Sequence, residues 1–115
     1  MFNKLRTVIY HVADLEKAKA WYSAISEKSP YFDEPFYVGF DLNGCELGLD
    51  PDCTNIVKGN QSIAYWSVDN IDDSLQKLQA HGAVIVQPVT NVGGPVEVAI
   101  IEDPFGNNIG LICGA

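Results

Sequence analysis

The sequence predicts an α+β fold made of two tandem βαβββ modules. The first observation that supports this prediction is the similarity of two stretches, Glu102–Ile112 and Phe40–Leu49. Each joins an acidic residue, a glycine-containing turn and a short apolar strand. A second support is the alignment of Thr7 with Ile63, which superimposes two β-rich runs, each followed by a helix cap and a helical pattern. Strand, helix and hairpin therefore recur in the same order, which indicates an internal duplication.

Both modules are expected within a single domain spanning residues 1–115. A chain of 115 residues has an ordinary domain length, and its hydrophobic content of 47% is typical of a globular protein. We place the first module at about residues 4–49, a polar linker without periodicity at 50–61, and the second module at 62–113. Each half is too small to be stable alone, so the modules are expected to pack on each other or on a second chain.

The charge and the cysteine content exclude several classes of partner. A formal net charge of −8 without a Lys/Arg cluster repels phosphate backbones and anionic lipids, so we expect neither nucleic acid nor a membrane as a partner. The apolar run after Arg6 is broken by His11 and Asp14, too early for a signal peptide or a spanning helix. Three cysteines without a CxxC pair, Cys45, Cys53 and Cys113, predict unreactive, reduced thiols in a cytoplasmic protein.

The first module is predicted to start with a strand over Lys4–Val12 and to continue with a helix. The alternation of the strand places Val8, Tyr10 and Val12 on one face and Thr7, Ile9 and His11 on the other. Asp14 is the expected N-cap of the helix, whose apolar positions begin at Leu15 and which ends before Pro30. This helix is expected to cover the Val8 face.

A hairpin follows this helix. Residues Ser29–Glu34 are turn-like and are predicted to lie in a loop. The two strands are expected at Phe36–Leu42 and Cys45–Leu49, because the Asn43-Gly44 pair between two apolar runs is a strong hairpin signal.

The second module repeats this order with longer connections. A strand over Ser62–Val68 is predicted, and then a helix that Asn70 caps and Gly82 ends. In the strand, Ile63, Tyr65 and Ser67 share one face, and Trp66 points to the helix. Three further strands are expected at Ala83–Gln87, Val96–Glu102 and Asn108–Ile112. The loop 90–95, rich in glycine, is a candidate lid.

The chain resembles the vicinal oxygen chelate superfamily, the group of glyoxalases, bleomycin resistance proteins and extradiol dioxygenases. The resemblance rests on Val12–Tyr22, Ser67–Asn70 and Glu102–Ile112, in this order and spacing. It covers nearly the whole chain and implies curled mixed sheets around a cavity, with helices on the outer faces. A fold of this kind hosts many activities, so it does not itself assign one.

The resemblance also implies where a metal site would lie, and this chain departs from it there. Metal-using members contribute one His, Glu or Gln from each of four strands. The corresponding positions here are Thr7, Gly48, Ile63 and Gly110. None of these is a usual ligand for iron, zinc, nickel or manganese, so we expect no metal and no other cofactor.

The cavity implied by the resemblance is expected to bind a small organic ligand. Its expected lining combines the four positions that the resemblance implies, the residues that alternation places on the same faces, and Tyr37 from the rim: Thr7, Ile9, His11, Tyr37, Gly48, Ile63, Tyr65, Asn108 and Gly110. The two glycines are expected to leave room at the cavity floor. Five aromatic residues are expected either at its rim, where acidic groups favour a cationic ligand, or in the core or a dimer interface: Tyr31, Phe32, Phe36, Tyr37 and Phe40.

Two functions from different classes fit this cavity. The first is a metal-free binding protein that sequesters a small hydrophobic or aromatic molecule, working as a homodimer. The second is an enzyme, a lyase, isomerase or dioxygenase, either metal-free through His11 with Glu46 or Glu97 or with an off-pattern metal site. His11 and Glu97 also have purely structural interpretations, as a satisfied strand histidine and a solvent-facing carboxylate. A third class, a structural partner domain, leaves the cavity without a role.

Overall fold

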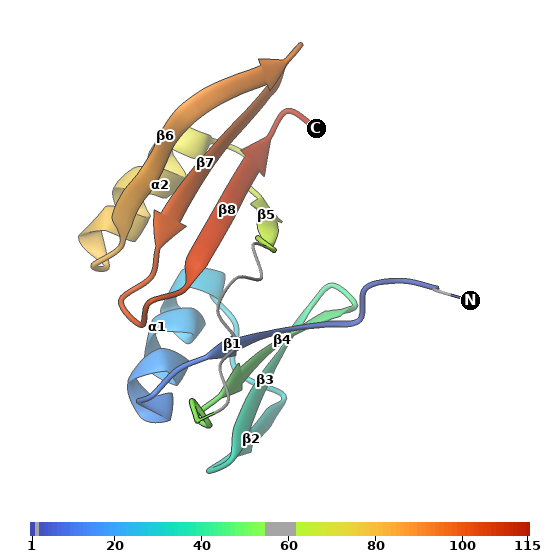
Figure 1. Cartoon of the computed structure of the whole chain (residues 1–115), viewed down its shortest axis with the longest axis vertical. Coiled ribbons are helices and arrows are strands. Elements are labelled where there is room, and N and C mark those ends of the chain that lie inside the picture. Colours follow the sequence, from blue (N-terminus) through green and yellow to red (C-terminus); the bar gives the residue numbers. More distant parts are fainter. Residues whose placement is uncertain (2, 55–61) are drawn as a thin grey trace. The chain divides into compact units, whose positions relative to one another are not determined.

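The protein folds into two compact units, Met1–Lys58 and Gly59–Ala115 (Figure 1). The structure is a computed structural model that describes residues 1, 3–54 and 62–115. Within that part, each unit holds one helix and one four-stranded mixed sheet. The α+β prediction with two tandem βαβββ modules is therefore confirmed, while residues 55–61 of the expected linker lie outside the described residues.

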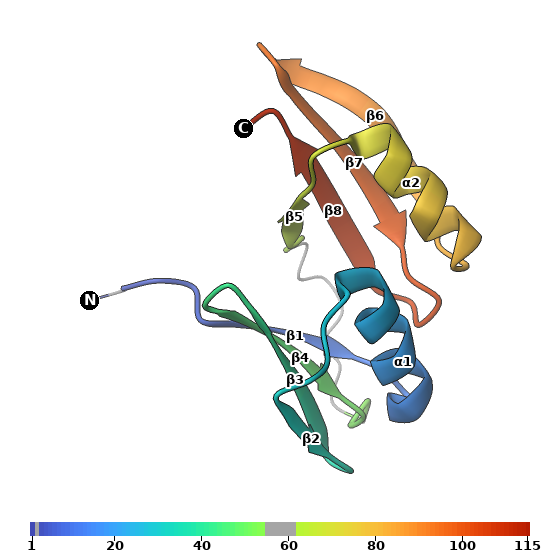
Figure 2. The ribbon, with the colours of Figure 1, turned by 180° about the vertical axis from the view of Figure 1, so that it is seen from behind.

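The first unit runs β1 (Thr7–His11), α1 (Leu15–Ser26), β2 (Phe32–Glu34), β3 (Tyr37–Leu42) and β4 (Cys45–Asp50). Its sheet has the order β1-β4-β3-β2, in which β1 is parallel to β4 and the other pairs are antiparallel. Helix α1 packs against β3 and β4 (Figure 2). The core of the unit forms between them from Tyr10, Val12, Leu15, Ala18, Tyr22, Val38, Phe40, Leu47 and Leu49.

Strand β2 is the one element of this unit that the sequence did not predict. It lies within the turn-like stretch 29–34 and pairs with β3 at the edge of the sheet. All three of its residues are exposed, so no alternation of apolar and polar side chains marks it. The adjacent bond from the backbone N–H of Tyr31 to the carbonyl oxygen of Gly39, 3.0 Å, extends the same edge. A pairing of this kind depends on β3 and cannot be read from residues 29–34 alone.

The second unit runs β5 (Tyr65–Ser67), α2 (Ile71–Ala80), β6 (Val84–Gly93), β7 (Val96–Glu102) and β8 (Asn108–Cys113). Its sheet order, β5-β8-β7-β6 with β5 parallel to β8, repeats that of the first unit. The register repeats too, because Ile9 faces Gly48 as Tyr65 faces Gly110. Aligning Thr7 with Ile63 and Gly48 with Gly110 is thereby confirmed.

The loop expected at residues 90–95 is wrong, because these residues form the end of a long hairpin. Strand β6 continues to Gly93, and Thr90 pairs with Val98 on β7. Register shifts interrupt the pairing of β6 and β7, which hides the period-two pattern from sequence analysis. At the tip, the Asn91 side chain accepts from the N–H of Gly93 and donates to the carbonyl of Gly94, which closes the turn.

Both helices start at the predicted caps. The Asp14 carboxylate accepts from the backbone N–H of Lys17 at 3.1 Å, and the Asn70 side-chain oxygen accepts from that of Asp73 at 3.0 Å. Helix α2 ends shortly before Gly82, whose φ of 93° is a left-handed conformation that glycine adopts easily. Neither described helix combines the length and the apolar character that crossing a membrane requires.

The turn between β7 and β8 is held by a buried carboxylate. Asp103 is 3% exposed, and its Oδ1 accepts from the backbone N–H groups of Phe105 at 2.9 Å and Asn107 at 2.7 Å. The Asn107 side chain donates to the other oxygen at 3.3 Å. Asp103 thus satisfies donors that the turn would otherwise leave without partners.

Replacing Asp103 with alanine is expected to lower the free energy of unfolding by about 1–3 kcal/mol, because buried N–H donors lose their acceptor. Urea denaturation measures the loss. Asp103→Asn is the matched variant, since it keeps the shape and an acceptor oxygen and should lose less. Equal losses in the two variants would show that the charge, not the hydrogen-bonded oxygen, stabilises the turn.

Candidate functional site

The candidate site lies on the face of the first sheet that α1 does not cover. Because Thr7 faces Glu46 and Ile9 faces Gly48, alternate residues of β1 and β4 share this face. Tyr37 belongs to the same face, since it lies two residues from Gly39, which also faces Gly48. Four predicted ligand-binding residues of the first module therefore share one surface with His11: Thr7, Ile9, Tyr37 and Gly48.

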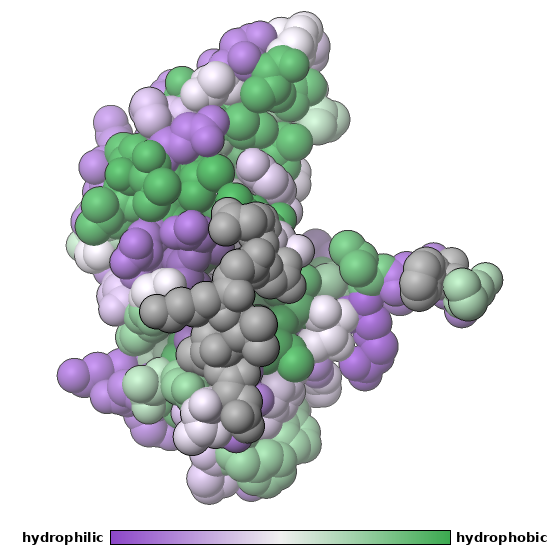
Figure 3. All heavy atoms as spheres, viewed as in Figure 1, coloured by the Kyte–Doolittle hydropathy of each residue, from purple (hydrophilic) through white to green (hydrophobic). Residues whose placement is uncertain are grey.

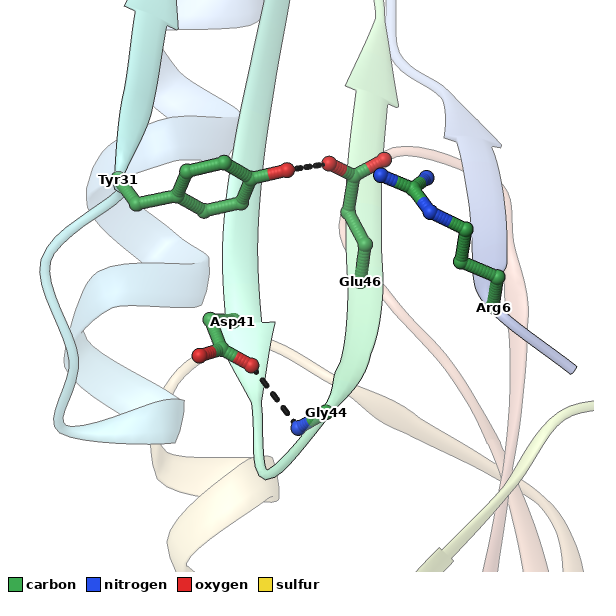
Figure 4. A pocket seen from close by; sticks show the side chains of 5 residues that line it. All are labelled: Arg6, Tyr31, Asp41, Gly44 and Glu46. Atoms are coloured by element: carbon green, nitrogen blue, oxygen red, sulfur yellow. Dashed lines mark hydrogen bonds between the residues drawn. The ribbon is translucent and has the colours of Figure 1, made fainter. Parts of the chain in front are cut away.

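Glu46 is the centre of a hydrogen-bond network on this face. The Tyr31 hydroxyl donates to its Oε1 (Figure 4), and the Tyr37 hydroxyl donates to its Oε2 at 2.8 Å. Thr7 Oγ1 also donates to Oε2, at 3.3 Å. One carboxylate therefore joins β1, β3, β4 and the residue before β2.

The network keeps Glu46 charged and the tyrosines protonated. The hydrogen bond from Tyr31 is the main cause that lowers the pKa of Glu46; bonds from Tyr37 and Thr7 and the charge of Arg6 add to it, and burial opposes it. Burial and then the bond to Glu46 raise the pKa of Tyr37, and the bond to Glu46 also raises that of Tyr31. At neutral pH the two phenols act as hydrogen-bond donors and are poor acids or bases.

Tyrosine side chains fill the space above both glycines. A methyl group on Gly48 would overlap the Tyr37 hydroxyl, and one on Gly110 would come within 2.5 Å of Tyr65 Cδ1. Each tyrosine side chain occupies the space over a position where the sheet has no side chain. The expectation that these glycines leave room at the cavity floor is therefore wrong, because the phenol rings take up that room.

The residues at the four positions where metal-using relatives bind a metal ion are poor metal ligands in this chain. Thr7 offers a hydroxyl that is already bonded to Glu46, while Gly48, Ile63 and Gly110 have no donor side chain. Throughout residues 1, 3–54 and 62–115, no three His, Cys, Asp or Glu side chains gather closely enough to hold a metal ion. The donor set of this chain therefore does not fit such a metal.

His11 lies at the other end of this face from Glu46. Thr7 is the neighbour of Glu46, whereas His11 pairs with Asp50 at the end of β1. Four residues of strand separate the two positions by about 13 Å. Nδ1 of His11 is 2.9 Å from the carbonyl oxygen of Asp52, and because a carbonyl only accepts, that nitrogen carries the proton. The structure therefore does not bring His11 and Glu46 together as an acid–base pair.

The second-module candidates lie on two sides of their sheet. Tyr65 shares the open side with Gly110 and is 47% exposed, whereas Glu97 alternates with the buried Ala99 and Ile101 on the side that α2 covers. Glu97 Oε1 is 4.0 Å from Cys113 Sγ. Ile63 precedes β5, and Asn108 is the exposed first residue of β8. All three cysteines are free thiols.

The five aromatic residues that were expected together separate into three environments. Phe40 is fully buried beneath α1, so of the two alternatives the core holds for this residue and the rim is wrong. Phe32 and Phe36 are exposed and meet edge to face, with ring centres 6.0 Å apart. Only Tyr31 and Tyr37 belong to the Glu46 network.

A hollow of about 290 Å³ opens beside Glu46. It is lined by Arg6, Tyr31, Asp41, Gly44 and Glu46 (Figure 4). Arg6 and Asp41 were not among the site residues that the sequence predicted. The signal was present in the alternation, because Asp41 sits two residues beyond Gly39 on the same face of β3.

The network should make stability depend on acidity. Because the pKa of Glu46 is lowered in the folded chain, its contribution is fully present above the ordinary value of 4.5 and is lost as the pH falls through the folded pKa. The unfolding free energies of the unaltered chain and of Glu46→Gln should thus differ by a constant amount above about pH 5 and converge below it. Urea denaturation across this range tests it; parallel pH curves would contradict it.

Comparison with solved structures identifies the fold. A glyoxalase/bleomycin resistance protein/dioxygenase family enzyme from Burkholderia phytofirmans PsJN matches with a TM-score of 0.82 and 16% identity, covering 98% of this chain and 100% of that chain. A glyoxalase-related enzyme from Fulvimarina pelagi matches with a TM-score of 0.78 and 16% identity, covering 98% of this chain and 89% of that chain. Lactoylglutathione lyase from Agrobacterium tumefaciens matches with a TM-score of 0.75 and 17% identity, covering 96% of this chain and 93% of that chain.

At these identities the structural likeness shows the fold alone. No curated protein sequence matches the chain. The family model of the Glyoxalase/Bleomycin resistance protein/Dioxygenase superfamily matches residues 4–111, nearly the whole chain. With the repeated βαβββ units and this match, the chain belongs to the Glyoxalase/Bleomycin resistance protein/Dioxygenase superfamily.

Proposed function

We propose that this protein is a metal-free binding protein of the glyoxalase/bleomycin resistance type, which holds a small hydrophobic or aromatic molecule and protects against it by sequestration. The observation that carries the proposal is the Tyr37 ring lying on Gly48 with its hydroxyl held by Glu46. This arrangement presents an aromatic surface where a metal-using relative would need a ligand side chain.

The open face supports this proposal with apolar and polar groups side by side. Ile9 is 47% exposed and neighbours Gly48, so it lies next to the Tyr37 ring. A few fixed polar groups beside an apolar wall are typical of small-molecule sites. Because Thr7, Tyr31 and Tyr37 all donate to Glu46, that carboxylate is better suited to hold the wall in place than to accept a proton from a substrate.

The proposal includes a cytoplasmic homodimer as the working form. Three free thiols fit a reducing compartment. Pairing of two chains would cover apolar residues that each unit exposes, such as Tyr65 in the second. The ligand site would then be completed across two chains or lie against their interface.

The test is binding of 1-naphthol, a neutral aromatic probe, followed through backbone amide shifts in NMR spectra. We expect shifts at Ile9, Gly39 and Gly48, and a loss of affinity of at least about tenfold in Tyr37→Ala, equivalent to about 1.4 kcal/mol. Phe36→Ala is the matched control, because that ring is 66% exposed and outside the network.

Two results would overturn the proposal. The first is the absence of shifts on this face with 1-naphthol, or equal affinity in Tyr37→Ala and the unaltered chain. The second is one transition-metal ion per chain in the purified protein, removed together with an activity by a chelator. That second result would favour the alternative, an enzyme with an off-pattern metal site. Turnover that His11→Gln abolishes would favour a metal-free enzyme.

A further inference from the structure

The hollow beside Glu46 is lined by charges of both signs. Thr7, Glu46 and Asp41 face one another on β1, β4 and β3, and Arg6 precedes Thr7. Figure 4 shows Arg6 and Asp41 on opposite sides of Glu46. A ligand in the hollow would therefore meet a guanidinium at one end and carboxylates at the centre and the other end.

Neither carboxylate has an ion-pair partner in the part of the chain that the structure describes, although three hydroxyl groups donate to Glu46. Asp41 and Glu46 are direct cross-strand partners on the same face, and like charges in such a pair repel. Asp41 accepts from the backbone N–H of Gly44 at 2.9 Å, but it forms no ion pair with any residue that the structure describes. A cationic group between Asp41 and Glu46 would relieve the repulsion.

Arg6 has hydrogen-bonding capacity to spare. Its guanidinium donates to Thr7 Oγ1 at 2.9 Å, and no carboxylate in the described part of the chain lies within ion-pair distance of it. A guanidinium has five N–H donors in a fixed fork that matches a carboxylate. An anionic group would complete these donors.

We propose that this hollow binds the head group of a small zwitterion, a free amino acid with an aromatic side chain, with its ammonium at Asp41 and Glu46 and its carboxylate at Arg6. The inference rests on the proposed function, because the hollow is the polar end of the same open face. A ligand with only an ammonium would make no use of the Arg6 donors that Thr7 leaves open, and one with only a carboxylate would face two carboxylates. The volume of about 290 Å³ suits a ligand of amino-acid size.

Three probes with the same aromatic ring separate the charges: L-phenylalanine, phenethylamine and 3-phenylpropionate. Phenethylamine is L-phenylalanine without the carboxylate, and 3-phenylpropionate is L-phenylalanine without the ammonium. Titration at pH 7, followed by the amide shifts of Glu46 and Gly44, should show L-phenylalanine binding at least about tenfold more tightly than either.

Two substitutions test the assigned contacts. Arg6→Gln should reduce the affinity for L-phenylalanine to that for phenethylamine, and Asp41→Asn should weaken it while keeping the acceptor for the Gly44 N–H. Glu102→Gln, an equal change of charge at an exposed residue of the second unit, should leave binding unchanged.

The outcomes distinguish this inference from the proposed function. Equal binding of phenethylamine and L-phenylalanine would overturn the zwitterion, because Arg6 would then play no part. If 1-naphthol binds at Gly48 and none of the charged probes reaches the hollow, the inference fails and the proposed function stands. If neither 1-naphthol nor L-phenylalanine binds this face, both fail.

Discussion

Replacing Phe40 with alanine is expected to lower the free energy of unfolding by about 3–5 kcal/mol. The Phe40 side chain is 0% exposed, lies in the middle of β3 and pairs in register with the buried Leu47. Its removal would leave a cavity between the sheet and α1, where packing cannot readily collapse. Urea denaturation measures the loss, and in a Trp66→Phe background the fluorescence of Trp21, which lies on α1, reports on this unit alone.

Phe36→Ala is the control for this prediction. The same side chain, four residues earlier, is 66% exposed, so its truncation should change the unfolding free energy by less than about 0.5 kcal/mol. If Phe36→Ala costs as much as Phe40→Ala, the aromatic residues between 31 and 40 form one packed cluster, and the separation of core from surface described above is wrong.

Sedimentation equilibrium at micromolar concentration is expected to give twice the chain mass of 12.6 kDa. In the second unit, apolar side chains reach the surface over the strands (Figure 3), and edge strand β6 exposes Val84 by 65%, Val86 by 51% and Val92 by 59%. An exposed apolar edge strand is prone to pair with another chain. A second copy would cover it, with about 1,200–2,000 Å² buried in total.

The double variant Val84→Lys/Val86→Lys should shift this equilibrium to monomer, because two lysines at a paired edge oppose association. Lys28→Arg, at an exposed position of the first unit, is the control. A clean monomer for the unaltered chain at all micromolar concentrations, still able to bind 1-naphthol, would contradict the homodimer and show that one chain completes its own site.

Local signals predicted most of the secondary structure. The caps Asp14 and Asn70 were identified because capping needs only a side-chain acceptor and an N–H three residues away. The hairpin at Asn43-Gly44 was predicted because this pair of residue types favours positive φ, and both residues adopt it in the structure, at 55° and 95°. The faces of β1 followed from alternation, which the register with β4 confirms.

Signals that depend on another strand were missed. Strand β2 exists through its pairing with β3, and the end of β6 through its irregular pairing with β7. The candidate site was found only in part for the same reason. Glu46 was named as a candidate, but the donors Tyr31 and Tyr37 come from residues 15 and nine positions away in the chain.

The sequence by itself determined the duplicated βαβββ order, the helix caps and the sides of the strands, because these follow from interactions within a few residues and from the period of each element. Only the tertiary structure decided that Tyr37 and Tyr65 fill the space above Gly48 and Gly110, and that Tyr31, Tyr37 and Thr7 converge on Glu46. The physical reason is that strand register sets which side chains become neighbours across a sheet, and register arises from the packing of the whole unit.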